Sequence, residues 1–275
     1  MRLLNNNELR WWCETSTSKI FRRIGHVCET PIGRFSYLDR GANVLAVAHL
    51  DTALECQSFN MTRDVVYSPA LDDRLGAYAI TSLFPRQGVV MDVLLTEGEE
   101  TMESTAQFFE PKKQYNWIVS FDRAGTDVVM YQYKDKEMEK LLQTYDLGPA
   151  GLGSFSDICW LDHLGCKAFN IGIGYDGQHS LLCHANLKDT RAQLWKFGKM
   201  WQSLKDILLP HVTELPLWYD DWTVDDVIVE WEGHLFLAET KDEEFYIRCM
   251  IDALEGGAVE DEIWEYYVGE SELNA

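Results

Sequence analysis

Five short runs along the chain have the length and the apolar or aromatic content of buried strands. Polar residues or glycines follow each run, as they do where a strand meets a turn. The runs are residues 35–39, 43–50, 89–96, 117–122 and 167–175. Strands of this kind usually form the core of a sheet.

Stretches with helical spacing of apolar residues lie between these runs. The longest covers residues 187–209, which Lys188, Asp189 and Thr190 open and Pro210 closes. Strands that alternate with helices predict an α/β fold, with a mostly parallel twisted sheet covered by helices on both faces. The other predicted helical stretches are residues 8–24, 72–84, 101–109, 134–144 and 157–164.

The pattern changes after Pro216. Residues 218–239 alternate as a hairpin would around Glu232 and Gly233, and the rest of the segment favours acidic helices and a tail. We therefore predict an α/β domain over residues 1–213 and a small acidic C-terminal appendage over residues 214–275.

Composition and charge narrow the possible functions. The hydrophobic fraction of 46% is enough for a full core. The net charge of −21, from 24 Lys and Arg against 45 Asp and Glu, argues against nucleic acid or an anionic membrane as partner, since both need a basic surface. The sequence shows neither the apolar run of about 20 residues that a membrane span needs nor a signal-peptide core. Seven cysteines without a CxxC pair favour reduced, buried thiols and a cytoplasmic protein.

Polar side chains gather where the predicted strands end. Open α/β sheets bind ligands beyond the carboxyl ends of their strands. Such oxygen and imidazole donors suit Zn²⁺ or a similar divalent ion. Each residue also has a plainer interpretation, because an acid that opens a helix is usually a cap and an acidic loop is usually solvated. The set comprises His49, Asp51, Asp72, Asp73, Glu97, Glu99, Glu100, Asp122 and His179.

Five motifs in a fixed order carry a family resemblance. They are "AHLDT" (48–52), "ALDDRLG" (70–76), "LLTEGEE" (94–100), "SFDRAG" (120–125) and "GSFSDICWLDHLGCKAFNIGIGYDGQHS" (153–180). In this order and spacing the chain resembles the co-catalytic di-zinc exopeptidases, and most of all their compact single-domain aminopeptidases. Only 20 residues separate Asp51 from Asp72 and 56 separate Asp122 from His179, so neither gap holds the inserted domain of several branches.

The resemblance implies a role for each of these residues. His49 and Asp122 would hold one zinc ion, and Glu100 and His179 the other. Asp72 would bridge the two ions, and the peptide bond between Asp72 and Asp73 would be cis.

The same resemblance assigns the remaining acids. Glu99 would be the general base, and Asp51 would hydrogen-bond the ring of His49 from behind, which orients a metal-binding imidazole. Because alternate residues of a strand share a face, Asp51 can turn back toward His49. Glu97 is expected to be structural, and His184 competes with His179 as the last ligand.

The favoured function is therefore a hydrolase of amide bonds with two zinc ions per chain, acting as an aminopeptidase on a short peptide or aminoacyl substrate. Two alternatives stay open: an N-acyl amino-acid deacylase, and a non-catalytic binding protein on the same scaffold. The sequence leaves the oligomeric state undetermined.

Overall fold

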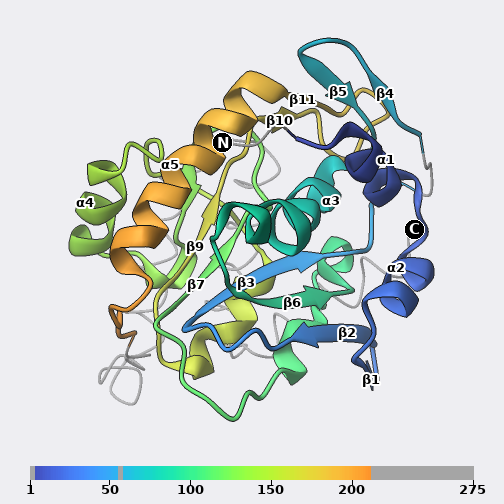
Figure 1. Ribbon diagram of the computed structural model, residues 1–275. Coiled ribbons are helices and arrows are strands. Elements are labelled where there is room, and N and C mark those ends of the chain that lie inside the picture. Colours follow the sequence, from blue (N-terminus) through green and yellow to red (C-terminus); the bar gives the residue numbers. More distant parts are fainter. Residues whose placement is uncertain (1–3, 55–57, 212–275) are drawn as a thin grey trace, which may run out of the picture. The chain divides into compact units, whose positions relative to one another are not determined.

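The computed structural model describes residues 4–54 and 58–211 (Figure 1). The predicted acidic appendage over residues 214–275 lies outside the described residues. Within them, no helix combines the length and the apolar character that crossing a membrane requires.

A seven-stranded mixed sheet forms the centre of the described part. Its four middle strands, β6, β3, β7 and β9, are parallel, and the strands at both edges pair antiparallel. The strands in spatial order are β1 (Val27–Thr30), β2 (Gly33–Leu38), β6 (Asp92–Thr96), β3 (Val44–His49), β7 (Trp117–Ser120), β9 (Ala168–Ile171) and β8 (Val128–Val129).

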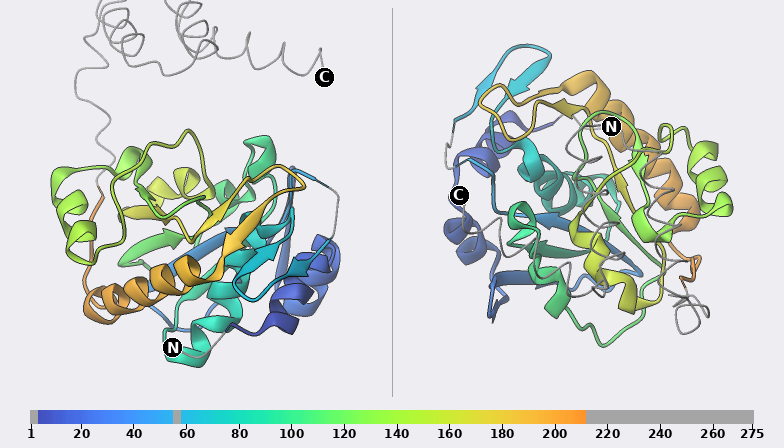
Figure 2. Two further views of the ribbon diagram at one scale, coloured as in Figure 1. Left: turned by 90° about the horizontal axis from the view of Figure 1, so that it is seen from above. Right: turned by 180° about the vertical axis from the view of Figure 1, so that it is seen from behind.

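Alternate residues of the middle strands supply two separate apolar layers. In β3, Val44, Ala46 and Ala48 belong to one cluster and Leu45 and Val47 to the other. The first cluster includes residues of α1 (Asn6–Glu14), α3 (Leu71–Tyr78), α4 (Lys136–Thr144) and α5 (Leu187–Leu204). Shorter 3-10 segments at Thr105–Phe108, Tyr131–Tyr133 and Asp157–Leu164 supply the second. The predicted α/β fold with both sheet faces covered is confirmed, and Figure 2 shows the helices and strands from two further sides.

A second, four-stranded antiparallel sheet was not predicted. Its strands have only two or three residues, too few to show an alternating pattern. One of its loops, between β10 and β11, carries His179 and so brings that residue to the main sheet. In spatial order the strands are β10 (Tyr175–Asp176), β11 (His184–Asn186), β5 (Val65–Tyr67) and β4 (Asn60–Met61).

Five of the six predicted helical stretches differ from the observed elements. The stretches 101–109 and 157–164, which the structure describes throughout, contain 3-10 segments, at Thr105–Phe108 and Asp157–Leu164, and no α-helix. The stretch 8–24 is two helices, α1 and α2 (Thr17–Ile24), because Thr15 and Ser16 have extended backbone. The stretch 72–84 is α3 followed by a π-helical turn at Ala79–Leu83. Helix α5 ends at Leu204, before Pro210.

The thiols follow expectation only in part. The five cysteines in the described ranges are all free, but Cys28 is exposed and Cys159 is half-buried. The expectation of buried thiols therefore holds for Cys13, Cys166 and Cys183.

Candidate metal centre

The parallel register brings the predicted site residues to one edge of the sheet. His49 is the last residue of β3 and pairs with Thr96, the last residue of β6. Val47 pairs with Ser120, the last residue of β7, and Asp122 follows two positions later. The carboxyl ends of three neighbouring strands therefore open onto the same region, where such sheets bind their ligands.

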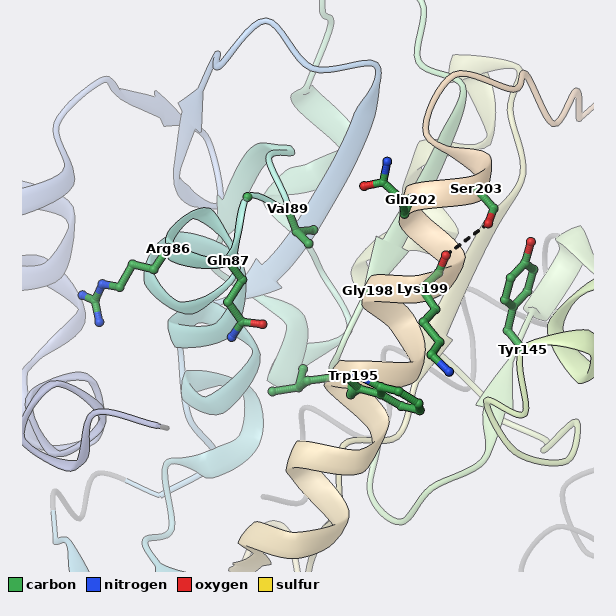
Figure 3. A pocket seen from close by; sticks show the side chains of 11 residues that line it. Arg86, Gln87, Val89, Tyr145, Trp195, Gly198, Lys199, Gln202 and Ser203 are labelled. Atoms are coloured by element: carbon green, nitrogen blue, oxygen red, sulfur yellow. Dashed lines mark hydrogen bonds between the residues drawn. The ribbon is translucent and has the colours of Figure 1, made fainter. Parts of the chain in front are cut away.

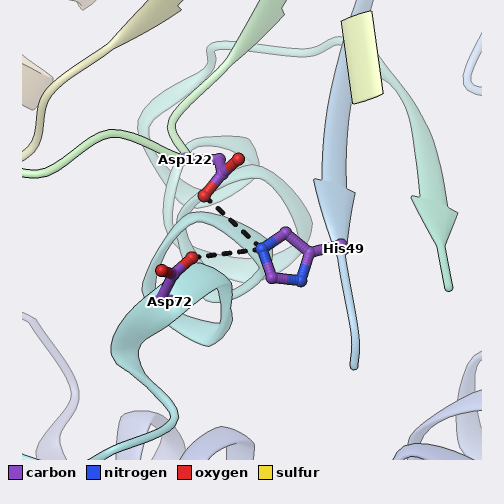
Figure 4. A group of neighbouring side chains, drawn as sticks. All are labelled: His49, Asp72 and Asp122. Carbon is purple, nitrogen blue, oxygen red and sulfur yellow. Dashed lines mark hydrogen bonds and ion pairs between the residues drawn. The ribbon is translucent and has the colours of Figure 1, made fainter. Parts of the chain in front are cut away.

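His49, Asp72 and Asp122 form a first group of possible ligands (Figure 4). The His49 Nε2 lies 3.1 Å from Asp72 Oδ1 and 3.4 Å from Asp122 Oδ1. The His49 ring is fully buried. Three side chains from a strand, a helix start and a loop thus face one point.

Asp72, Glu100 and His179 form a second group. The His179 Nε2 lies 3.0 Å from Glu100 Oε2 and 3.4 Å from Asp72 Oδ2. Asp72 therefore turns Oδ1 toward the first group and Oδ2 toward the second. The peptide bond between Asp72 and Asp73 is cis, as predicted.

Glu99 and Asp51 flank the first group without belonging to either. Glu99 Oε2 lies 3.8 Å from His49 Nε2. On the other side of the ring, His49 Nδ1 lies 3.1 Å from the Asp51 carbonyl oxygen and 3.6 Å from its carboxylate Oδ1. Asp51 Oδ2 accepts a hydrogen bond from the Glu100 backbone N–H at 3.1 Å. Asp51 thus lies behind His49 and joins it to the loop that carries both glutamates.

The structure separates the competing candidates. The carboxylate of Glu97 pairs with Arg34, with Oε1 2.7 Å from Nη2, as expected of a structural residue. The Oδ1 of Asp73 accepts a hydrogen bond from the Gly76 N–H inside helix α3, and Asp73 belongs to neither ligand group. The ring of His184 stacks on Tyr67, outside both groups.

The carboxylates of the site outnumber the positively charged side chains beside them. Burial raises the pKa of Glu99 to about 9, and the charge on Asp122 acts in the same direction. Burial and then the charge on Asp72 also raise the pKa of Asp122 well above its usual range. Burial would lower the pKa of His49, but the surrounding carboxylates, above all Asp122, raise it well above its ordinary value.

This donor set fits divalent cations. Carboxylates that lie close together and are buried away from water either stay protonated or need a positive charge beside them. The described side chains offer only two imidazoles against the carboxylates of both groups, and they offer the oxygen and nitrogen ligands that Zn²⁺ takes. The residues predicted as ligands from the sequence thus come together as predicted, and their binding of zinc remains a prediction.

A cavity of about 380 Å³ opens onto both groups. Its walls add residues that the sequence did not point to. Arg123 and Tyr175 stand beside the acids, and the Tyr175 hydroxyl donates a hydrogen bond to Asp122 Oδ1 at 3.3 Å. Both residues lie inside the quoted motifs, Arg123 in "SFDRAG" and Tyr175 in the last one, but the motifs give them no role. The remaining new wall residues are Met102, Ala124, Tyr131, Gly153, Ser154, Phe155 and Gln178.

A larger cavity of about 780 Å³ lies elsewhere, along α5 (Figure 3). Its wall includes Arg86, Tyr145, Trp195 and Lys199, and the Lys199 amine lies 3.5 Å from the centre of the Trp195 ring. None of the residues that line it in the described chain is a carboxylate, histidine or cysteine. The smaller cavity is therefore the better candidate for chemistry.

Comparison with known proteins supports the fold. No protein-family model and no curated protein sequence matches the chain. A tripeptidase from Staphylococcus aureus has a TM-score of 0.56 at 9% identity, over 74% of this chain and 100% of that one. The aminopeptidase PepT from Bacillus cereus has a TM-score of 0.55 at 9% identity, over 72% and 97%. The TET1 peptidase from Pyrococcus horikoshii has a TM-score of 0.50 at 14% identity, over 72% and 98%.

These three structures are all peptidases, and the identities are low enough that the likeness concerns the fold. The resemblance to the di-zinc exopeptidases that the motifs suggested is consistent with these neighbours. The described part of this chain has the α/β fold of known aminopeptidases and tripeptidases.

Proposed function

We propose that the chain is a zinc-dependent aminopeptidase. The observation that carries the proposal is the pair of ligand groups that share Asp72, with Glu99 beside them and a cavity open to both. A binding protein on the same scaffold would not need a free carboxylate at Glu99 in addition to a full ligand set. Catalysis is therefore favoured over the non-catalytic alternative.

His49, Asp72 and Asp122 would hold one ion, and Asp72, Glu100 and His179 the other. Two such ions supply an activated water and a polarised scissile carbonyl. Glu99 takes a proton from the attacking water at its carboxylate and passes it to the nitrogen of the leaving amine. Asp51 keeps the His49 ring in place, because both its carbonyl and its carboxylate lie at Nδ1.

The charge of the chain favours a free amino terminus in the substrate. Residues 1–213 carry a net charge of −4, from 22 Lys and Arg against 26 Asp and Glu, which weakly favours a protonated α-amine over an extra carboxylate, and salt weakens this effect further. Among the described residues, the cavity wall holds four acids against one arginine and one histidine. Release of N-terminal residues is therefore proposed over C-terminal cleavage.

The test uses one pentapeptide in three forms: free, N-acetylated and C-amidated. The zinc-loaded protein should release the N-terminal residue of the free and amidated forms, and acetylation should block it. Elemental analysis should find up to two zinc ions per chain. Faster hydrolysis of the acetylated peptide or of an N-acyl amino acid would replace the aminopeptidase by the deacylase, and absence of tight metal would contradict the metal centre.

A further inference from the structure

Arg123 is the single Lys or Arg among the residues that line the site cavity in the described chain. Arg123 directly follows Asp122, which belongs to the first ligand group. The other charged wall residues are Asp72, Glu99, Glu100 and Asp122, besides His179. A lone cation in an acidic cavity needs an explanation.

One edge of this guanidinium is held by Asp127. The Arg123 Nε lies 3.1 Å from Asp127 Oδ1, and Nη2 lies 2.8 Å from Oδ2. This pairing leaves Nη1 unengaged by Asp127, and the Arg123 side chain keeps 30% of its surface exposed. The guanidinium is therefore fixed in direction but still able to bind a second anion.

The chain leaves space for this pair. A Cβ added at Gly151 would lie 2.1 Å from Asp127 Oδ2 and 3.3 Å from Arg123 Nη2. Any other residue at Gly151 would displace the pair. The Arg123–Asp127 pair adds little to the stability of the fold, since partly exposed ion pairs contribute about 0–1 kcal/mol to the free energy of unfolding.

Position decides which anion Arg123 can reach. Arg123 lines the same cavity as Glu99 and Asp122, and its Cα lies about 3.8 Å from that of Asp122, so its side chain is near the place proposed for the reacting bond. In a dipeptide the α-carboxylate belongs to the residue just after the scissile bond. A longer peptide has an amide there instead.

We propose that Arg123 binds the α-carboxylate of the residue that follows the scissile bond, so that dipeptides with a free C-terminus are preferred substrates. The inference rests on the proposed function, because it places the scissile bond at the two ligand groups. Guanidinium suits this task, since it offers planar paired donors to a carboxylate even when one edge is already occupied. N-acyl amino acids carry the same carboxylate and are the second possible source of this chemistry.

The experiment compares alanylalanine with alanylalanine amide on the zinc-loaded full chain. For the wild type, kcat/KM for the acid should exceed that for the amide about 10- to 100-fold, as a hydrogen bond to a charged group implies. The difference should appear mainly in KM. Arg123→Gln should bring the ratio close to one, and Arg123→Lys should keep part of it.

The variant Asp127→Asn distinguishes binding of the substrate carboxylate by Arg123 from a purely structural role of the Arg123–Asp127 ion pair. Both Arg123→Gln and Asp127→Asn break the ion pair, so a mere brace would lose the same activity in both, with an unchanged ratio of acid to amide. If Arg123 binds the carboxylate, Asp127→Asn should keep or raise the ratio, because it removes a competing negative charge. Arg10→Gln, which breaks an exposed ion pair with Glu14 on α1, is the matched control and should leave the ratio unchanged.

The two proposals fail in different ways. Equal losses for acid and amide in Arg123→Gln overturn the inference while the aminopeptidase stands. If N-acetylalanine alone is hydrolysed and the rate depends on Arg123, the carboxylate site stands and the aminopeptidase falls. If nothing is hydrolysed, calorimetric titration with alanine and alaninamide tests the same preference, and equal binding of both overturns it.

Discussion

The loop after β6 offers a test of the proposed chemistry within seven residues. It carries four glutamates in four environments. Glu97 pairs with Arg34, Glu99 faces His49, Glu100 faces His179, and Glu103 is exposed. Substituting each in turn by Gln removes one negative charge at nearly constant shape.

Glu99→Gln should keep zinc and fold but lose turnover. The amide oxygen cannot take up the proton of the attacking water, and Glu99 belongs to neither ligand group. General bases contribute about 100- to 10,000-fold, which corresponds to about 3–5 kcal/mol of activation free energy. The loss should appear in kcat rather than KM.

The other three substitutions are its controls. Glu100→Gln should lower zinc occupancy, because it removes a ligand of the second group. Glu97→Gln should leave kcat unchanged and lower the free energy of unfolding by about 1–3 kcal/mol, through the weakened contact with Arg34. Glu103→Gln should change neither quantity.

The assay is steady-state hydrolysis of a dipeptide, together with elemental analysis and urea unfolding of each variant. Full activity in Glu99→Gln would refute its role as the base. If Glu97→Gln then lost turnover at normal stability, the proton acceptor would be Glu97. Loss of zinc in Glu99→Gln would instead make Glu99 a ligand.

Three further predictions concern the metal, the last ligand and the core. Compared with the protein in free zinc at 100-fold above Kd, the chelated protein should have a Tm lower by about 5–10 °C for each ion bound, because one bound ion stabilises the fold by about 2.7 kcal/mol there. An unchanged Tm would contradict tight binding. His179→Ala should lose zinc and activity while His184→Ala keeps both, and the reverse would exchange the two residues. Asp92 is buried and accepts hydrogen bonds from Tyr37 and Tyr115, so Asp92→Asn should lower the free energy of unfolding by about 3 kcal/mol at pH 7. Burial opposes ionisation of Asp92, but its partners, with Lys113 first, lower its pKa below the ordinary value. The ionised Asp92 therefore stabilises the fold fully above the unfolded pKa near 4, and the stability difference between wild type and Asp92→Asn should shrink as the pH falls below that value. A constant difference down to pH 2 would refute this linkage.

The middle of the fold could be predicted from sequence because it is dictated by long apolar runs. Parallel strands buried on both faces read as continuous hydrophobic segments, as in residues 44–48 of β3 and 93–95 of β6. The first polar residue after each apolar run indicated where the strand ends. The small antiparallel sheet could not be predicted, since its pairing depends on backbone contacts between segments far apart in the chain.

The candidate site divides in the same way. Residues of the motifs, such as His49 and Asp122, could be named because strand ends meet at one edge of a parallel sheet. Arg123 and Tyr175 lie inside the same motifs but were not singled out, because the motifs give them no role and only the folded chain shows that they line the cavity. The choice of His179 over His184 rested on a motif, and the structure shows a physical reason, since the ring of His184 is stacked on Tyr67.

Two charged side chains of the motif around Asp72 lie on opposite sides of the helix start. Asp72 faces the cavity, whereas Arg74, two residues later, is buried and turns back to the N-terminal helices. Its guanidinium donates hydrogen bonds to the Thr15 carbonyl at 3.2 Å and to Thr17 Oγ1 at 2.9 Å. Thr17 Oγ1 in turn donates to the carbonyl of Leu50 at 2.9 Å.

Leu50 lies between His49 and Asp51, so this chain of hydrogen bonds ends in the turn that orients the His49 ring. Asp72 and His49 are therefore both connected to the same anchor, at the junction of α1 and α2. These two side chains lie 3.1 Å apart, between His49 Nε2 and Asp72 Oδ1. Two contacts in the described part of the chain join this turn to the loop after β6: the Glu100 N–H donates to Asp51 Oδ2 at 3.1 Å, and the Ala53 N–H donates to Glu100 Oε1 at 2.8 Å. The turn that orients His49 and the loop that carries Glu99 are therefore held together at Glu100.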